Sequence, residues 1–123
     1  MNFDNKVKAT KRSVLSFLIK VKNEGSSIVG YGAPAKGNTL LNYCGIRKDY
    51  IDYTVDRSPH KQGYFLPGTH IPIFYPDKIK ETQPDYVVIF PWNLKDEIMQ
   101  QMEHIREWNG KFVTFIPEVF IHT

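Results

Sequence analysis

The sequence predicts an α/β fold: a three-layer domain with a mostly parallel sheet of about five strands and a leading N-terminal helix. Short apolar segments alternate with amphipathic ones along most of the chain, which is the pattern of a parallel sheet with helical crossovers. One segment, Tyr86–Phe90, is apolar at every position, as in a strand covered on both faces. A third observation is a glycine-rich turn at residues 30–37, directly after a short apolar strand.

The length of the chain limits it to one hydrophobic core, because 123 residues do not suffice for two. We therefore predict a single domain over residues 1–123, with the leading helix in residues 1–25 and an alternating β/α unit in residues 26–123. Hydrophobic residues make up 41% of the chain and charged residues 24%, which is the composition of an ordinary globular domain.

Composition also restricts location and partners. No apolar run reaches the roughly 18 residues of a membrane span, and the N-terminus lacks the apolar stretch of a secretory signal. The one cysteine, Cys44, cannot form an internal disulfide, so we expect a cytoplasmic protein with no membrane partner. A net charge of +3 favours anionic ligands but is too small to predict nucleic-acid binding. No metal site is predicted, because no cysteine and histidine cluster has metal-ligand spacing.

The first half of the chain begins with an amphipathic helix over residues 4–23 that ends at Gly25. The apolar face of this helix is formed by Val7, Val14, Leu15, Leu18 and Val21. The next elements are predicted as a strand at 27–30, a short helix at 37–43 that ends at Gly45, and a strand at 50–55.

The second half continues the alternation after an unusual crossover. Residues 56–69 contain two glycines and two prolines without a helical period, so a loop is predicted where a standard unit has a helix. Pro72 marks the strand at 70–74 as an edge or irregular strand. The remaining elements are predicted as a helix at 76–81, a strand at 86–90, a helix at 93–109 that ends at Gly110, and a strand at 112–116. This order predicts a Rossmann-like domain.

The glycine-rich turn predicts a phosphate-binding loop. Gly30, Gly32 and Ala35 have the G-x-G-x-x-[G/A] spacing, in which glycines let the backbone approach a phosphate and a helix start offers free N–H groups. Lys36 adds a positive charge but precedes Gly37, so the loop is not a Walker A motif. The alternative is a tight turn without a ligand. The candidate ligand-binding residues of this turn are Gly30, Tyr31, Gly32, Ala33, Pro34, Ala35, Lys36, Gly37 and Asn38.

An acidic residue follows the second predicted strand. Asp56 lies 21 residues after Ala35, where an acid in dinucleotide sites bonds a ribose hydroxyl. The alternative is that Asp56 caps the turn that it begins, and the two roles are compatible. Lys61 is a further candidate for ligand binding, together with Arg57 and His60, although these are equally typical of a solvated loop.

A third candidate segment follows the fourth predicted strand. Trp92 offers a stacking surface and Asn93 an amide at the sheet edge where ligands bind. The alternative is that Asn93 is the N-cap of the next helix and that Trp92 packs beside it. His104 and His122 are predicted to be surface residues. No spacing indicates a nucleophilic triad or a pair of catalytic carboxylates, so no catalytic residue is assigned.

Four segments resemble the C-terminal domain of the sugar C-methyltransferases, and the resemblance covers nearly the whole chain. They are residues 30–43 (GYGAPAKGNTLLNY), 55–63 (VDRSPHKQG), 66–72 (LPGTHIP) and 91–98 (PWNLKDEI). This family methylates a carbon of nucleotide-linked deoxy-ketosugars with S-adenosylmethionine. The resemblance implies that residues 30–39 and 91–93 face a nucleotide-linked sugar. It also implies a S-adenosylmethionine-binding methyltransferase domain, in cis or in trans, because this chain has no zinc-ligand cysteines and no methyl-donor domain.

The leading hypothesis is therefore a nucleotide-sugar-binding domain with no cofactor of its own, which positions the sugar for methyl transfer on another domain. Lys36 and the amides of Gly32–Gly37 would bind the pyrophosphate, and Asp56 or Asn93 would bond hydroxyl groups. Trp92 would pack against the base or the sugar. The alternatives are an NAD-binding oxidoreductase fragment, based on the same glycines and Asp56, and a non-catalytic scaffold domain.

Overall fold

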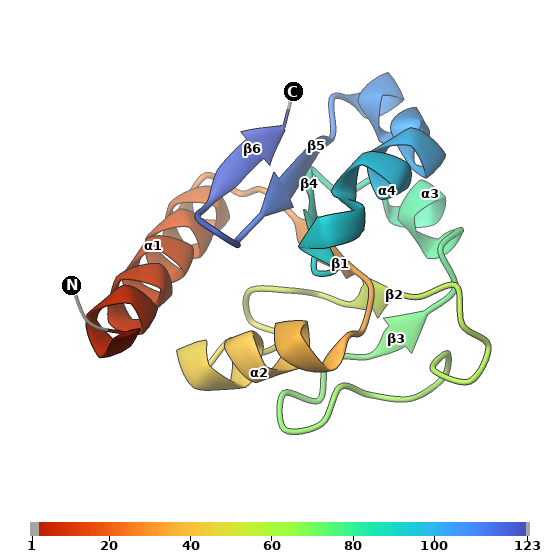
Figure 1. Ribbon diagram of the computed structural model, residues 1–123. Coiled ribbons are helices and arrows are strands. Elements are labelled where there is room, and N and C mark those ends of the chain that lie inside the picture. The colour runs from red at the N-terminus through yellow and green to blue at the C-terminus, as the bar shows by residue number, and fades with distance from the viewer. Residues whose placement is uncertain (1–2, 123) are drawn as a thin grey trace.

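Six strands form one sheet in the computed structural model, which describes residues 3–122 (Figure 1). The strand order is β3-β2-β1-β4-β5-β6, and all pairs are parallel except β5 with β6. The strands are β1 (Ile28–Tyr31), β2 (Thr54–Val55), β3 (Ile73–Phe74), β4 (Tyr86–Ile89), β5 (Lys111–Thr114) and β6 (Phe120–His122). The helices are α1 (Phe3–Asn23), α2 (Ala35–Cys44), α3 (Lys78–Thr82), η1 (Trp92–Leu94), α4 (Lys95–Gln101) and η2 (Glu103–Trp108), of which η1 and η2 are 3-10 helices.

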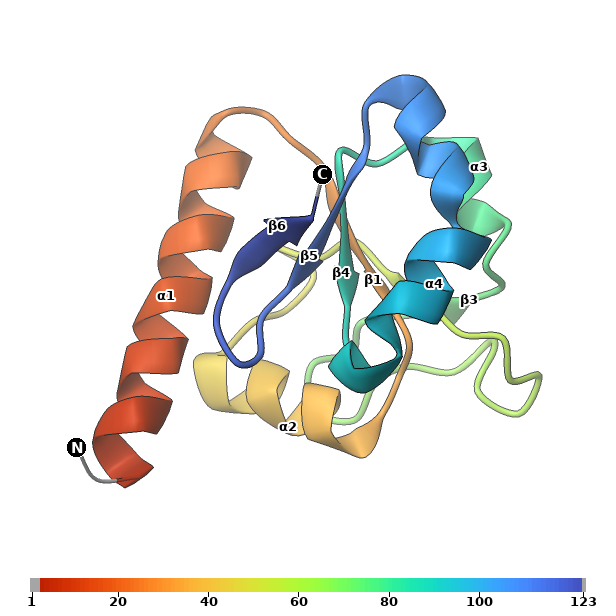
Figure 2. The same cartoon turned by 45° about the horizontal axis from the view of Figure 1, so that its top comes forward.

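Helices cover both faces of the sheet, so the predicted three-layer, Rossmann-like fold is confirmed. α1 and α2 lie on one face, and α3, α4 and η2 lie on the other (Figure 2). The strands alternate between the two apolar cores: Val88 packs with the α1 and α2 residues, whereas Val87 and Ile89 pack with α3 and α4. Three residues of the predicted apolar face of α1 are buried in the core that α1 and α2 share with the sheet. They are Val14, Leu18 and Val21.

The direction of the chain through the sheet reverses between β1 and β4. From β1 the chain moves outward to β2 and β3, returns to form β4 beside β1, and then continues to β5. The last residues of the two central strands, Tyr31 and Ile89, are partners in the parallel register. Ligands of open α/β sheets bind outside the carboxyl ends of the strands at such a reversal. The topology therefore directs attention to the loops after β1 and β4.

Glycines end the first two helices as predicted. Gly25 follows α1 with a φ of 82°, and the Ser26 N–H donates to the Val21 carbonyl at 3.0 Å. Gly45 ends α2 with a φ of 72°, and the Ile46 N–H donates to the Leu41 carbonyl at 2.9 Å in the same way. α2 begins at Ala35, two residues before its predicted start, because Pro34 is extended and caps the helix.

Two predicted strands are shorter than expected. The strand predicted at 50–55 is reduced to β2, since the amides of Tyr50 and Ile51 bond the Arg47 carbonyl in a turn. The strand predicted at 70–74 is reduced to β3, because His70 has a φ of 59° and bonds back to Leu66. β3 is an edge strand of the sheet, as Pro72 predicts.

The helix predicted over 93–109 is instead three shorter elements, η1, α4 and η2. The apolar residues Met102, Ile105 and Trp108 recur every three positions, which matches the 3-10 repeat of η2 rather than an α-helix. The predicted end of this segment, at Asn109 with Gly110 as the cap, is one residue too late. Asn109 itself has a φ of 62° and takes the left-handed position that was predicted for Gly110.

The sequence did not predict β6, which makes the sheet one strand larger than expected. β6 pairs antiparallel with β5 and places His122 opposite Phe112. β6 has only three residues, which is shorter than the runs of about four to eight by which strands are recognised in a sequence.

Candidate functional site

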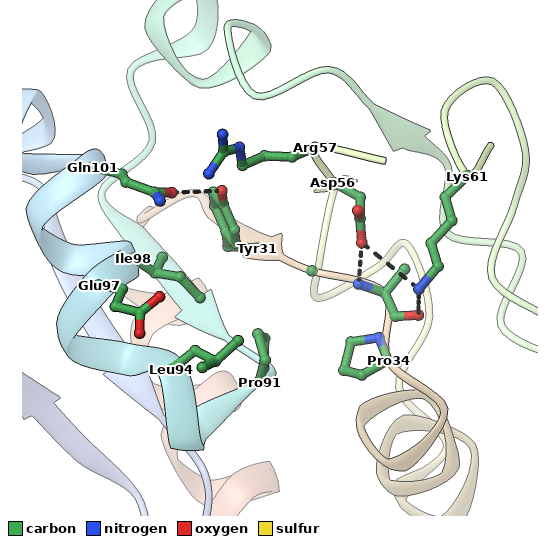
Figure 3. A pocket seen from close by; sticks show the side chains of 12 residues that line it. Tyr31, Pro34, Asp56, Arg57, Lys61, Pro91, Leu94, Glu97, Ile98 and Gln101 are labelled. Atoms are coloured by element: carbon green, nitrogen blue, oxygen red, sulfur yellow. Dashed lines mark hydrogen bonds and ion pairs between the residues drawn. The ribbon is translucent and has the colours of Figure 1, made fainter. Parts of the chain in front are cut away.

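A cavity of about 300 Å³ lies at the reversal point of the sheet (Figure 3). Three segments form it: the loop from β1 to α2, the loop after β2, and the segment from the end of β4 through α4. It is lined by Tyr31, Gly32, Ala33, Pro34, Asp56, Arg57, Lys61, Pro91, Leu94, Glu97, Ile98 and Gln101. The structure thus brings together the glycine-rich turn, Asp56 and Lys61, three features that the sequence predicted as one site.

The three glycines of the turn are required for different structural reasons. Gly32 has a φ of 97°, and a Cβ there would lie 2.7 Å from the Pro91 Cδ, so glycine lets the loops after β1 and β4 meet beneath the cavity. Gly30 and Gly37 do not line the cavity. A Cβ on either would lie within 3 Å of Phe90, so these glycines let β1 and α2 pack closely around that ring.

Asp56 ties the loop after β2 to the glycine-rich turn. Its carboxylate accepts hydrogen bonds from the Ala33 N–H at 3.0 Å and from the Ser58 N–H at 2.8 Å. Lys61 Nζ lies 4.0 Å from the same carboxylate and donates to the Ala33 carbonyl at 3.1 Å. Asp56 therefore caps its own turn, which was one of the two interpretations, and both carboxylate oxygens are already engaged.

The backbone amides available to a ligand are fewer than predicted. The prediction covered the amides of Gly32–Gly37, but the Gly32 N–H donates to the Val55 carbonyl at 2.6 Å, the Ala33 N–H donates to Asp56, and Pro34 has none. The first amide with a partner in α2 is that of Asn38, which donates to the Pro34 carbonyl. The amides of Ala35–Gly37 remain as the first turn of α2, where an α-helix supplies no acceptor.

Arg57 is the cation that is best placed to meet a ligand in this cavity. Figure 3 shows its guanidinium beside Tyr31, and within residues 3–122 it makes no hydrogen bond or ion pair. Lys61, by contrast, is held on the Ala33 carbonyl. Two carboxylates, Asp56 and Glu97, also line the cavity, so a free guanidinium is the group there that favours an anion.

Tyr31 forms a polar wall of the cavity. Its hydroxyl donates to the Gln101 Oε1 at 3.3 Å, which joins β1 to α4. Burial raises the pKa of Tyr31; the Arg57 guanidinium lowers this pKa in part, and the Asp56 carboxylate raises it. The phenol therefore stays protonated at neutral pH and keeps its hydrogen to donate.

Several predicted site residues lie away from this cavity. Ala35 and Lys36 are exposed in the first turn of α2, and Asn38 is half-buried on the same helix. Asn93 is exposed on η1 and is not the N-cap of α4, because Leu94 occupies that position. Trp92 lines a different cavity on the other side of η1. The sequence therefore grouped residues that the fold separates.

The α4 side of the cavity was not predicted from the sequence. Leu94, Glu97, Ile98 and Gln101 line it from one helix face. Their spacing of three, one and three positions is the repeat of one helical face, so the pattern itself was visible. What could not be read from the sequence is that this face is turned toward the glycine-rich turn.

Comparison with known proteins identifies the family. The model of the C-methyltransferase C-terminal domain matches residues 1–117. The chain belongs to this family. The C-methyltransferase NovU of Streptomyces niveus is 39% identical over 95 residues, which cover 77% of this chain and 23% of that protein. This C-methyltransferase C-terminal domain thus spans less than a quarter of its relative's length.

A solved structure supports the fold of this C-methyltransferase C-terminal domain. The UDP-D-quinovosamine 4-dehydrogenase of Vibrio fischeri superimposes with a TM-score of 0.55 at 17% identity, over 80% of this chain and 93% of the other. At this identity the likeness concerns the fold alone. None of the helices among residues 3–122 is long and apolar enough to cross a membrane. In the same residues, no group of three or more His, Cys, Asp or Glu side chains is arranged to hold a metal ion.

The two histidines that were predicted to be on the surface are half-buried. His122 bonds the Thr114 hydroxyl at 2.9 Å through Nε2. Burial lowers the pKa of His122, as does Lys95, and Asp96 opposes the shift. Burial also lowers the pKa of His104, with Lys80 acting in the same direction and Glu107 and Asp77 opposing it.

These shifts predict that the domain loses stability on mild acidification. A histidine whose folded pKa lies below its unfolded value of about 6.5 binds its proton more readily in the unfolded chain. The free energy of unfolding should therefore fall as the pH drops from 7 through 6.5, and this loss should end below the folded pKa values. Urea denaturation at several pH values measures it. In the His104→Asn, His122→Asn double variant the slope between pH 7 and 6 should shrink; an unchanged slope would contradict the assignment.

Proposed function

We propose that this chain is the nucleotide-sugar-binding domain of a S-adenosylmethionine-dependent sugar C-methyltransferase, and that it holds a ketosugar for methyl transfer on another domain. The observation that carries the proposal is the cavity at the reversal point, which the glycine-rich turn and the free Arg57 line and next to which α2 begins, directly after Pro34. Membership in the C-methyltransferase C-terminal domain family supports this role.

The pyrophosphate of the ligand is expected at the start of α2. The amides of Ala35–Gly37 and the N-terminal end of the helix dipole favour negative charge, and Lys36 projects from the same turn. Arg57 would approach from the opposite side with its planar fork of donors, which suits phosphate oxygens. Asp56 contributes indirectly, by fixing the Ala33 backbone rather than by bonding a ribose.

S-adenosylmethionine is expected on a separate domain or subunit. When bound, it supplies the methyl group. The family model that matches this chain is that of a C-terminal domain, and the matched segment is 23% of the relative's length, which supports a separate domain for the methyl donor. We propose that the partner domain is present in cis or in trans. We also propose a cytoplasmic location, which nucleotide-sugar chemistry and the free Cys44 fit.

In the reaction, this domain would position the substrate and would not transfer protons. Methylation at carbon next to a ketone requires that a base remove the adjacent proton and that the enolate carbon then attack the donor's methyl group in line, displacing a neutral thioether. A rigid hold on the nucleotide end of the substrate makes that alignment intramolecular, which lowers the barrier through proximity. We assign no catalytic residue to this chain.

Calorimetry with dTDP-4-keto-6-deoxyglucose, NAD and S-adenosylmethionine tests the proposal. Of these three ligands, we expect only the dTDP-sugar to bind. Lys36→Ala and Arg57→Ala should each weaken it by about 10–100-fold, which is the usual loss for one charge-assisted hydrogen bond. Lys111→Ala is the control, because Lys111 is an exposed cation at the amino end of β5, whereas the cavity lies at the carboxyl ends of the strands.

The other outcomes identify the alternatives. Binding of NAD alone would indicate an oxidoreductase fragment, and binding of S-adenosylmethionine alone would place the methyl donor on this chain. If none of the three ligands binds, the domain is a scaffold, and the Lys36→Ala variant should then behave as the parent in every measurement.

A further inference from the structure

The two edges of the sheet differ in how their backbone is covered. On the outer side of β3, the Ile73 carbonyl accepts a hydrogen bond from the Gly63 N–H at 2.9 Å, and the Ile73 N–H donates to the Tyr64 carbonyl at 2.8 Å. The segment 63–66 therefore covers this edge. The other edge is β6, which Figures 1 and 2 show as the last strand of the sheet.

The bonds between β4 and β5 determine which backbone groups of β5 point toward β6. The Lys111 N–H donates to the Asp85 carbonyl at 2.9 Å, so the backbone of Lys111 faces β4. Backbone groups point to alternate sides along a strand. Phe112 and Thr114, the residues at the next and the third position of the strand, with one residue between them, therefore turn their N–H and C=O groups toward β6.

The backbone on the outer side of β6 belongs to Ile121. In the antiparallel register Phe112 is opposite His122 and Thr114 is opposite Phe120, so these are the two pairs that exchange hydrogen bonds. Ile121 lies between them and directs its N–H and C=O away from β5. Within residues 3–122, neither of these two groups has a backbone hydrogen-bond partner. Ile121 thus offers one donor and one acceptor at the open edge.

The side chains of β6 leave this edge unprotected. Phe120 is 56% exposed and Ile121 is 38% exposed. The strand contains neither lysine nor proline, the residues that commonly guard an edge against pairing. The His122 ring lies 4.8 Å from the Phe120 ring between centroids, and its bond to the Thr114 hydroxyl holds it there. Free backbone groups beside apolar side chains form a surface to which a further strand can be added.

We propose that two copies of this chain associate by pairing β6 with β6, antiparallel, about a two-fold axis at Ile121. The second copy is the partner because the edge is complementary to itself. In an antiparallel pair of this kind the two opposite residues exchange both hydrogen bonds, so Ile121 of each copy satisfies the N–H and the C=O of the other. The same axis sets Phe120 of each copy beside His122 of the other, which joins the two ring pairs into one stripe.

The pairing joins two sheets of six strands into one continuous sheet. Because strand direction reverses at the axis, the two cavities at the glycine-rich turns lie at opposite ends of the joined sheet. No residue of β6 lines that cavity, so the pairing is independent of the proposed function. A three-residue strand buries little area, so we expect a reversible dimer rather than a permanent one.

Sedimentation velocity over a range of protein concentrations tests the pairing. We expect the apparent mass of the parent chain to double between low micromolar and submillimolar concentration. Ile121→Lys should weaken self-association by at least about tenfold, because it sets two like charges opposite each other and removes the apolar pair. Phe65→Lys is the matched control, since Phe65 is 58% exposed and lies in the segment that covers the other edge. A chain that stays monomeric throughout would leave this edge to a strand of another protein and overturn the proposal.

A mixing experiment tests the two-fold axis. Ile121→Glu should be monomeric like Ile121→Lys, whereas an equimolar mixture of the two variants should recover the doubled mass, since residue 121 of one copy meets residue 121 of the other. Recovery would also show that both variants fold. Pairing about Ile121 is overturned if Ile121→Lys dimerises as the parent does. It is also overturned if the mixture stays monomeric while the circular dichroism of both variants matches that of the parent.

Hydrogen exchange of the Ile121 amide tests the same contact in the parent chain. In a single copy this amide has no acceptor within the described part of the chain, whereas in the pair it donates to the carbonyl of the second copy. Its exchange rate should fall by at least about tenfold between the concentrations at which the chain is monomeric and dimeric. A dimer that forms without slowing this amide uses another surface and would contradict the proposal.

Discussion

Replacing Gly30 with alanine is expected to lower the free energy of unfolding by about 3 kcal/mol, at the upper end of what overpacking costs. A Cβ on Gly30 would lie 2.4 Å from the Phe90 Cε2 and 2.8 Å from the Thr54 Oγ1. Both neighbours are buried, and β1 is held by parallel strands on both sides, so neither the strand nor the ring has room to move. Chemical denaturation of the variant measures the loss.

A double variant identifies the ring as the cause. Phe90→Leu removes the Cε2 atom, so it should offset part of the loss in Gly30→Ala. It should not rescue Gly37→Ala, where the added Cβ would lie 2.9 Å from the Phe90 Cβ, an atom that leucine keeps. Gly63→Ala is the control, because Gly63 has a positive φ but no atom within 4 Å; it should cost about 1 kcal/mol. Equal losses in Gly30→Ala and Gly63→Ala would contradict the steric explanation.

The glycine spacing correctly indicated where the cavity lies, but it did not indicate what each glycine contacts. Because glycine is required wherever chains approach closely, the same spacing serves a phosphate or an aromatic ring. Here Gly30 and Gly37 face Phe90, and only Gly32 borders the cavity. The sequence contains Phe90 but not its distance from these glycines, which depends on the pairing of β1 with β4.

The layers and order of the fold were predictable because they follow from local periodicity. The break of residues 93–109 into three elements was not recognised, since apolar spacings of three and four are both read as one helical face. That break had consequences for the site. The 3-10 turn η1 turns Trp92 toward β5 and β6 while Leu94 faces the glycine-rich turn, so one predicted site became two neighbouring cavities.

The sequence could not show which cation of the loop after β2 is free, or which way the α4 face points, for a different reason. Charged residues in a loop have the same pattern whether they meet a ligand, a carboxylate or water. Lys61 and Arg57 are four positions apart, yet the first is held by the Ala33 carbonyl and the second makes no such bond within the described residues. Only the tertiary contacts separate these roles.

Replacing Asp56 with alanine is expected to lower the free energy of unfolding by about 2–4 kcal/mol. The change leaves the N–H groups of Ala33 and Ser58 without their charged acceptor, and each such loss costs about 1–2 kcal/mol. Asp56→Asn keeps one acceptor oxygen and should lose about half as much. Denaturation of both variants measures the effect, with Asp49→Ala, an exposed acid in a turn, as the control.

The same substitution distinguishes a loop anchor from a ribose ligand. If Asp56 anchors the loop, Asp56→Ala should destabilise the domain and weaken dTDP-sugar binding by roughly tenfold, because the Ala33 backbone beside the phosphate position is no longer fixed. An acid that served only a ribose would be free in the unliganded protein, and its loss would abolish binding while leaving stability intact. The 3.0 Å bond to Ala33 and the 2.8 Å bond to Ser58 favour the anchor, since they hold the carboxylate on the two loops in the unliganded protein.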